Sequence, residues 1–255
     1  LPPFPFLAIR FALAFLTLLP FLYIQRQHIS KSAVNKGILI GITLFLGYAT
    51  QTIGLQYTTA SNAGFITGLN VVIVPIYVAL YCKRFPRPAI VIGALCAAAG
   101  LALLSIGPGF TVNRGDPIVL ICAFCFAAHI FFVGKFAPEV NATVLASFQI
   151  LTVSVLSLIG TLFLPQPTMT FSPYVWFGLI LTAVVCTSMA FFIQSKMQQF
   201  TSASHTAIIF ASEPVFAAVF AFLLAGELLS QKGLIGAAFV LSGILIAEFS
   251  SIKQN

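Results

Sequence analysis

Charged residues are scarce in this chain of 255 residues. Asp, Glu, Lys and Arg together make up 7% of it, whereas about 25% is usual for a soluble domain. Hydrophobic residues make up 60%, and the mean hydropathy is +1.07. Such a chain has too few polar side chains to cover a water-facing surface, which predicts an integral membrane protein embedded in a lipid bilayer.

The residues that build catalytic and metal centres are also few. There are five acidic residues, three His and five Cys, and an odd number of Cys does not predict a disulfide framework. The spacing Cys122-x-x-Cys125 falls inside an apolar segment and is interpreted as packing. Motifs of zinc proteases, serine hydrolases and phosphate-binding loops are absent from the sequence. We therefore expect no enzyme, no cofactor and no metal, and no basic stretch indicates a nucleic-acid partner.

Long apolar runs fill most of the sequence. A helix that spans a bilayer needs about 20 apolar residues, and nine runs qualify, separated by short connections. The sequence therefore predicts an all-α integral membrane fold with nine transmembrane helices, at 6–24, 34–56, 61–81, 89–106, 116–134, 142–164, 173–195, 205–225 and 231–249.

One stretch of the sequence occurs twice. Residues 51–61 return as residues 194–204, 143 positions later, with five identities and three close substitutions. The same offset pairs Gly93 with Gly236. Five predicted helices separate the starts of the two copies, and an odd number places the copies in opposite orientations. We therefore predict an inverted repeat, which is typical of secondary transporters.

The repeat also predicts the organisation of the whole chain. The second copy, residues 107–255, contains five predicted helices, whereas the first copy, residues 1–106, contains four. The helix that would complete the first copy would precede Leu1. We therefore expect a ten-helix protein, five plus five, whose first helix is missing from this chain.

The basic residues fit this arrangement. If the missing helix starts in the cytoplasm, the outer connections hold two basic residues, Arg114 and Lys232, and the cytoplasmic ones hold nine. Such a bias is the positive-inside pattern, and we expect a multi-pass protein of the bacterial inner (plasma) membrane. The nine are Arg26, Lys31, Lys36, Lys83, Arg84, Arg87, Lys135, Lys196 and Lys253.

Ionisable residues at membrane depth are candidate functional residues, because each is costly in lipid. Glu213 lies near the middle of 205–225, next to Pro214, which removes a backbone donor and is expected to kink the helix. The repeat aligns Asn70 with Glu213, and Pro75 is expected to kink the helix of Asn70. Glu213 is interpreted either as a carboxylate that binds a proton or substrate, or as a buried group that joins helices.

Other polar residues also lie in the predicted spans. His129 is interpreted either as a titratable site or as an interhelical hydrogen bond. Arg10 lies about one turn inside the outer boundary, where it either snorkels to the headgroups or faces a cavity as a charge for an anionic group. Gln149 is expected to hydrogen-bond across helices. In the repeated stretch, Ser61 and Ser204 are predicted to cap the helices that follow.

We predict that the substrate binds in a cavity near the membrane midplane, as in transporters with inverted repeats. The depth of the residues in their spans selects the expected lining: Tyr48, Asn70, Phe126, His129, Ser212 and Glu213.

Five short motifs follow one another along essentially the whole chain: Ile9-Arg10-Phe11, residues 54–60, residues 64–69, residues 212–216, and Gly226-Glu227 followed by Gly233 and residues 241–243. In this order and spacing they resemble the EamA branch of the drug/metabolite transporter superfamily. The resemblance implies ten helices in two inverted halves and a central cavity that opens alternately to each side. Many members of that family export amino acids or other small metabolites.

The sequence therefore favours a secondary active transporter of small metabolites such as amino acids, acting as an exporter by alternating access. Protons are the candidate coupling ion. The alternative is a non-transporting membrane scaffold that binds partners through its small-residue faces. The sequence is compatible with a homodimer and leaves the substrate, the direction and the coupling ion open.

Overall fold

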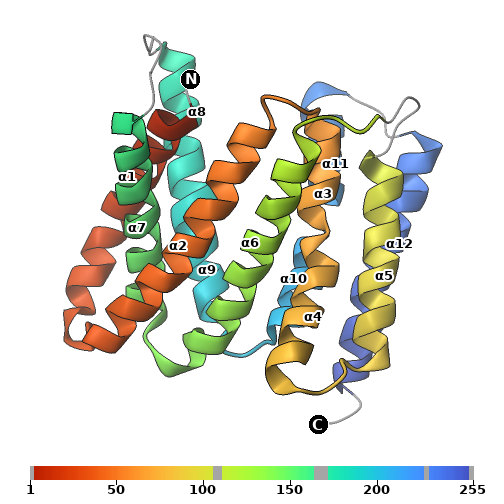
Figure 1. Cartoon of the computed structure of the whole chain (residues 1–255), viewed down its shortest axis with the longest axis horizontal. Coiled ribbons are helices and arrows are strands. Elements are labelled where there is room, and N and C mark those ends of the chain that lie inside the picture. The colour runs from red at the N-terminus through yellow and green to blue at the C-terminus, as the bar shows by residue number, and fades with distance from the viewer. Residues whose placement is uncertain (1–2, 106–110, 164–171, 227–229, 253–255) are drawn as a thin grey trace. The chain divides into compact units, whose positions relative to one another are not determined.

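The computed structural model describes residues 3–105, 111–163, 172–226 and 230–252, and all regular structure in these ranges is helical (Figure 1). Within them, nine helical segments are long and apolar enough to cross a membrane. Each overlaps one of the nine predicted spans, so the prediction of an all-α membrane fold is confirmed. The chain is a multi-pass integral membrane protein.

Contacts between helices divide the chain into two compact units. The first unit combines Leu1–Ala49 with Phe132–Thr201, and the second combines Thr50–Phe131 with Ser202–Asn255. Each unit therefore takes helices from both copies of the sequence repeat.

The first unit is built around α1 and α7, which pack along each other. Its last span is continuous from Pro173 to Met197 and contains a π-helical segment, η3, at its centre. The elements are α1 (Pro3–Ile24), η1 (Arg26–His28), most of α2 (Lys31–Gly54), η2 (Ala137–Glu139), α7 (Ala142–Phe163), α8 (Pro173–Ala183), η3 (Val184–Met189) and α9 (Ala190–Met197).

Buried polar contacts join the helices of the first unit. Gln149 on α7 donates from Nε2 to the Ser195 hydroxyl on α9 at 3.1 Å, so the predicted interhelical hydrogen bond of Gln149 is confirmed. Outside the buried part of the unit, near the start of α2, an ion pair links Lys36 to Glu139 on η2. In lipid the bond between Gln149 and Ser195 satisfies polar groups that have no water to bind.

The second unit contains two spans that are each made of two helices in succession, α3–α4 and α10–α11 (Figure 1). Its elements are α3 (Ala60–Gly68), α4 (Asn70–Cys82), α5 (Pro88–Ser105), most of α6 (Asp116–Phe136), α10 (Ala203–Phe210), α11 (Glu213–Ala225) and α12 (Gln231–Ile252).

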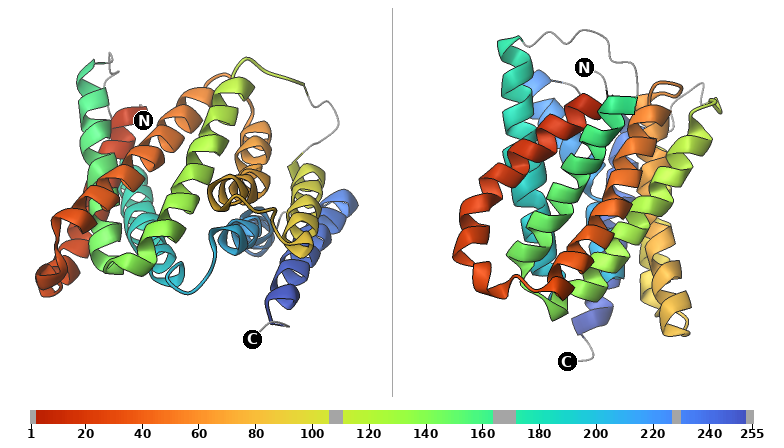
Figure 2. Two further views of the ribbon diagram at one scale, coloured as in Figure 1. Left: turned by 60° about the horizontal axis from the view of Figure 1, so that its bottom comes forward. Right: turned by 60° about the vertical axis from the view of Figure 1, so that its left-hand side comes forward.

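Helices α5 and α12 lie side by side (Figure 2). They pack backbone to backbone through four glycines. A Cβ at Gly93 would lie 2.7 Å from the carbonyl oxygen of Gly243, and a Cβ at Gly100 would lie 2.5 Å from that of Gly236. The earlier glycine of each helix meets the later glycine of the other, so the helices run antiparallel. The offset of 143 relates Gly93 to Gly236 and Gly100 to Gly243. Repeat-related residues therefore meet in reciprocal pairs, as they do across a two-fold axis.

The start of α6 is tied to the turn before α3 by a buried carboxylate. Asp116 accepts hydrogen bonds from the Thr58 hydroxyl, from Asn62 Nδ2 at 3.3 Å and from the Asn113 backbone N–H at 2.8 Å. Asp116 is 7% exposed, and these donors satisfy the charge that burial would otherwise leave unpaired.

The caps of α3 and α10 differ from those predicted. The Thr59 and Ser202 side chains each accept a hydrogen bond from the backbone N–H three residues later, at 3.1 and 3.3 Å. Ser61 and Ser204 already lie inside the first turns, so their prediction as caps is wrong: both helices begin before them. The true caps still correspond across the repeat, because Thr59 and Ser202 are 143 positions apart.

Candidate functional site

Two spans of the second unit are interrupted near their middle. Helix α3 ends at Gly68 and α4 begins at Asn70, whereas α10 ends at Phe210 and α11 begins at Glu213. Asn70 and Glu213 each come ten residues after the start of their span, about 15 Å along a helix. Because the hydrocarbon core is about 30 Å thick, both residues lie near its centre if the spans stand upright.

The two interruptions have matching backbone hydrogen bonds. The Leu69 N–H donates to the Ile66 carbonyl at 3.1 Å, and the Ser212 N–H donates to the Ile209 carbonyl at 3.0 Å. The two donors correspond across the repeat, and so do the two acceptors. These bonds to the third residue back tighten the chain into a short 3₁₀ turn, which in mid-helix often marks a functional hinge.

The prolines are placed differently in the two spans. Pro214 is the second residue of α11, where a missing N–H costs little, and α10 ends at Phe210, whose carbonyl this N–H would have bonded in a continuous helix. Pro75 lies in the second turn of α4, which continues to Cys82. The break at Leu69 therefore precedes Pro75 and occurs without a proline beside it.

One buried apolar cluster brings the two interruptions together. Val71, next to Asn70, and Ala211 and Val215, on either side of Glu213, belong to this cluster, and α5 and α12 supply its other walls. Its buried members are Val71, Ala94, Ala97, Leu101, Ile208, Ala211, Val215, Val240 and Ala247.

The polar groups at the breaks are less buried than this cluster. Glu213 is exposed, Asn70 and Ser212 are half-buried, and the Ser212 hydroxyl donates to the Ile209 carbonyl at 2.6 Å. No ion pair within the described ranges involves Glu213. An amide and a carboxylate thus stand at the N-terminal ends of two half-helices, where the helix dipole favours a negative charge. Together they can donate and accept hydrogen bonds and bind a cation, an amine or a proton.

The predicted lining residues Phe126 and His129 lie on α6. Phe126 is half-buried, and His129 is 2% exposed. Buried neighbours of these two residues on α6, Ala127 and Ile130, belong to a cluster with α4 and α10. Helix α6 therefore packs against both interrupted spans.

Arg10 and Tyr48 belong to the first unit and lie together there. The Arg10 guanidinium is 5.6 Å from the centre of the Tyr48 ring. Its Nε donates to the Thr187 hydroxyl at 2.8 Å, and its Nη2 donates to the Cys186 carbonyl at 3.4 Å. The side chain of Arg10 therefore reaches into η3 instead of extending to the end of α1.

Sequence reasoning missed the polar contacts around η3. Besides the bond from Arg10, the Thr17 hydroxyl donates to the Ser188 hydroxyl at 2.6 Å. The available signal was the pair Thr187-Ser188, two adjacent hydroxyl residues within an apolar run. A π-helical turn is itself frequent at functional sites.

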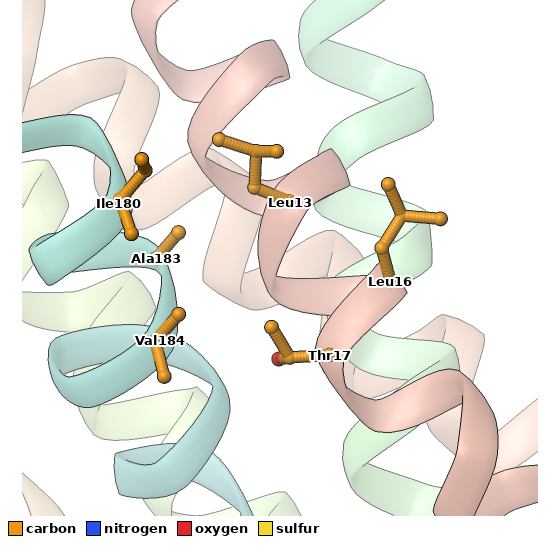
Figure 3. A pocket seen from close by; sticks show the side chains of 6 residues that line it. All are labelled: Leu13, Leu16, Thr17, Ile180, Ala183 and Val184. Carbon is orange, nitrogen blue, oxygen red and sulfur yellow. The ribbon is translucent and has the colours of Figure 1, made fainter. Parts of the chain in front are cut away.

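A small cavity of about 270 Å³ lies between α1 and the α8–η3 segment (Figure 3). Thr17 and Leu13 lie on the side of α1 that faces Ala183 and Val184. The lining is almost entirely apolar and consists of Leu13, Leu16, Thr17, Ile180, Ala183 and Val184.

The Gly226-Glu227 motif and possible metal ligands remain to be placed in the structure. Gly226 adopts a φ of 69°, the left-handed conformation that lets a glycine end helix α11. Glu227, which follows it in the motif, lies outside the described residues. Within the described ranges, no group of three or more His, Cys, Asp or Glu side chains could hold a metal ion.

Comparisons with known proteins agree with this architecture. The sequence profile of the EamA-like transporter family matches residues 1–106 and 113–249. An uncharacterized transporter of Archaeoglobus fulgidus is 36% identical over 96% of this chain and 77% of that protein. An uncharacterized transporter of Bacillus subtilis is 25% identical over 88% of this chain and 76% of that protein. A solved crystal structure, 19% identical, shares the fold with a TM-score of 0.85 over 99% of this chain and 89% of that one.

The length of the family match, the relative at 36% identity and the nine apolar spans lead to one conclusion. The chain is a membrane transporter and belongs to the EamA-like transporter family.

Proposed function

We propose that the chain is a secondary active transporter that exports small metabolites such as amino acids across the bacterial inner membrane. The observation that carries the proposal is the pair of interrupted spans, which hold Asn70 and Glu213 at mid-depth beside one buried cluster. Transporters built from repeats bind their substrates at such helix interruptions near the midplane.

The proposed mechanism is alternating access by an inverted repeat. A two-fold axis in the membrane plane makes repeat-related helices antiparallel, and the reciprocal glycine contacts of α5 and α12 support such an axis. The two copies can then exchange conformations, so that the site opens to one side of the membrane and afterwards to the other. The 3₁₀ turns at Leu69 and Ser212 are the proposed hinges.

Glu213 is the proposed binding group for a proton or for the amine of the substrate, and Asn70 supplies hydrogen bonds opposite it. A carboxylate at mid-depth is costly unless it serves a function or has a partner. We propose that this carboxylate binds a cation on one side of the membrane and releases it on the other. The bound cation is then the partner that offsets the cost of the charge.

The test is counterflow of labelled amino acids and small amines in proteoliposomes, with and without a pH gradient. We expect wild-type protein to show counterflow and Glu213→Gln to reduce it about tenfold to a hundredfold, because a hydrogen bond to a charged group contributes about 1.5–3 kcal/mol. Glu248→Gln, which removes another carboxylate of the second unit, on α12, is the matched control and should retain the wild-type rate.

Two results would count against the proposal. If folded Glu213→Gln keeps wild-type counterflow and its pH dependence, the carboxylate has no part in transport. If folded wild-type protein moves no solute in a broad panel, the scaffold interpretation gains, and capture of a partner protein becomes the property to measure.

A further inference from the structure

Arg10 is held at mid-depth of the first unit by the π-helical segment η3. Thr187, which accepts the bond from Arg10 Nε, comes 14 residues after the start of the span Pro173–Met197. At the helical rise this is about 20 Å from one end of the span and about 15 Å from the other. The guanidinium therefore ends near the centre of its neighbouring helix, far from either headgroup layer.

The orientation of the guanidinium is fixed by a chain of hydrogen bonds. The Thr187 hydroxyl donates its only proton to the Thr182 carbonyl, at 2.8 Å, so toward Arg10 it can act only as an acceptor. The Cys186 carbonyl accepts from Nη2. Together these two acceptors occupy the Nε–Nη2 edge of Arg10. Thr187 is completely buried, which locks the acceptor in place.

The other edge of the guanidinium, formed by Nη1 and the second proton of Nη2, has no protein acceptor within the described ranges. The rings of Tyr48 and Phe11 lie 5.6 and 5.8 Å from the guanidinium carbon, within range of a cation–π attraction, which does not use up an N–H donor of the guanidinium. In the same ranges the one ion pair joins Lys36 to Glu139, so no carboxylate of the described chain neutralises Arg10.

A charge at this depth without a counter-ion is costly. The open edge matches the one ligand geometry that the guanidinium recognises best, two parallel N–H···O bonds to a planar carboxylate. We propose that Arg10 binds the carboxylate of a small organic acid, such as the α-carboxylate of an amino acid, through its Nη1–Nη2 edge. That this acid is also the transported solute rests on the proposed function.

The proposal differs from snorkelling in what it requires of the side chain. A snorkelling arginine needs only its charge and its length, and lysine replaces it. A carboxylate fork needs the planar edge, and lysine, a point charge with rotating donors, does not provide it. The Arg10→Lys variant therefore separates the two roles.

The test measures binding to the full chain in phosphatidylcholine nanodiscs, by the ligand-dependent rise in the thermal unfolding midpoint. The probes are two acids, L-leucine and 4-methylpentanoate, with the corresponding amides, L-leucinamide and 4-methylpentanamide, in which an uncharged carboxamide replaces the carboxylate. The variants are Arg10→Lys and Arg10→Gln. Arg26→Gln is the matched control, because Arg26 is also an arginine stacked on a tyrosine, with the guanidinium carbon 4.9 Å from the Tyr23 ring centre, but it lies outside the spans.

We expect the acids to raise the unfolding midpoint of the wild-type protein. The amides should need at least tenfold higher concentrations to give the same rise. Arg10→Lys should weaken the acids at least tenfold, and Arg26→Gln should leave them unchanged. Thr187→Val keeps the arginine but removes its anchor, and should weaken the acids about threefold to tenfold even if the Arg10 variants fail to fold. Circular dichroism verifies that each variant is helical.

Several outcomes would overturn the proposal: equal stabilisation by acids and amides, full binding by folded Arg10→Lys, or no stabilisation by any acid. The unfolding midpoint could also rise without added acid, and only in nanodiscs that contain phosphatidylglycerol. That result would assign the Nη1–Nη2 edge of Arg10 to a lipid phosphate instead. Acid binding that depends on Arg10, in a protein without counterflow, would sustain this site and defeat the transport proposal, so the two can fail separately.

Discussion

The two interrupted spans of the second unit, α3–α4 and α10–α11, share a backbone and differ in chemistry. Both break at the same position of the repeat, with corresponding hydrogen bonds to the third residue back. Each span also begins directly after a polar capping residue, Thr59 or Ser202. After the break, α4 begins with Asn70 and α11 begins with Glu213.

This difference separates the cause of the interruption from the chemistry of the residue that follows it. The proline is next to the break in α10–α11 and well past it in α4, so a neighbouring proline is not required for a break at this point. Packing against the common cluster with α5 and α12 is shared by both spans. We infer that packing positions the breaks and that the residue after each break sets its chemistry.

The largest expected effect on stability comes from the glycine contacts behind this shared cluster. In Gly236→Ala the added methyl would lie 2.7 Å from the Gly100 carbonyl oxygen, which is backbone and cannot move aside cheaply. We expect a loss of about 1–3 kcal/mol in the free energy of unfolding, measured by reversible unfolding in mixed micelles. The loss would show that the second unit depends on the close contact of α5 and α12.

Gly64→Ala is the matched control for this substitution. Gly64 lies on α3, and apart from its chain neighbours and the nearby backbone of its own helix, no atom of the described residues is within 4 Å of its Cβ position. Alanine should leave stability unchanged or raise it by up to about 1 kcal/mol, because it favours the helix. Equal losses at both glycines would contradict the role assigned to the α5–α12 contact.

A smaller effect is expected from Pro214→Ala, which makes the α10–α11 break resemble the α3–α4 break. Pro214 occupies the first turn of α11, where its missing N–H costs little. We expect stability to change by less than about 1 kcal/mol and counterflow to remain within about threefold of wild type. Loss of transport as severe as in Glu213→Gln would mean that proline itself maintains the break.

Hydropathy and the repeat were sufficient to predict the spans and the alignment of Asn70 with Glu213. In the part of the chain that the structure describes, each of the nine apolar runs overlaps a helical segment, because in a bilayer a run of about 20 apolar residues has few alternatives to a helix. Gln149 was also predicted correctly, since an amide inside a span must find a partner on another helix.

Contacts between distant residues could not be predicted in the same way. The partners of Arg10 are 176 and 177 positions away, and nothing in the local pattern identifies them. The π-helical segment is a small change in hydrogen bonding that the apolar period does not record. The caps were missed because Thr59 and Ser61 are both favoured cap residues by type, and only the first helical turn decides between them.

The most direct test of whether both breaks line one transport site moves the carboxylate from one break to the other. Counterflow in proteoliposomes is compared for wild type, Glu213→Asn, and Glu213→Asn combined with Asn70→Glu. If both breaks line one site, Glu213→Asn loses at least tenfold in rate and the double variant recovers at least part of that loss. A folded Glu213→Asn protein that transports at the wild-type rate would contradict the claim.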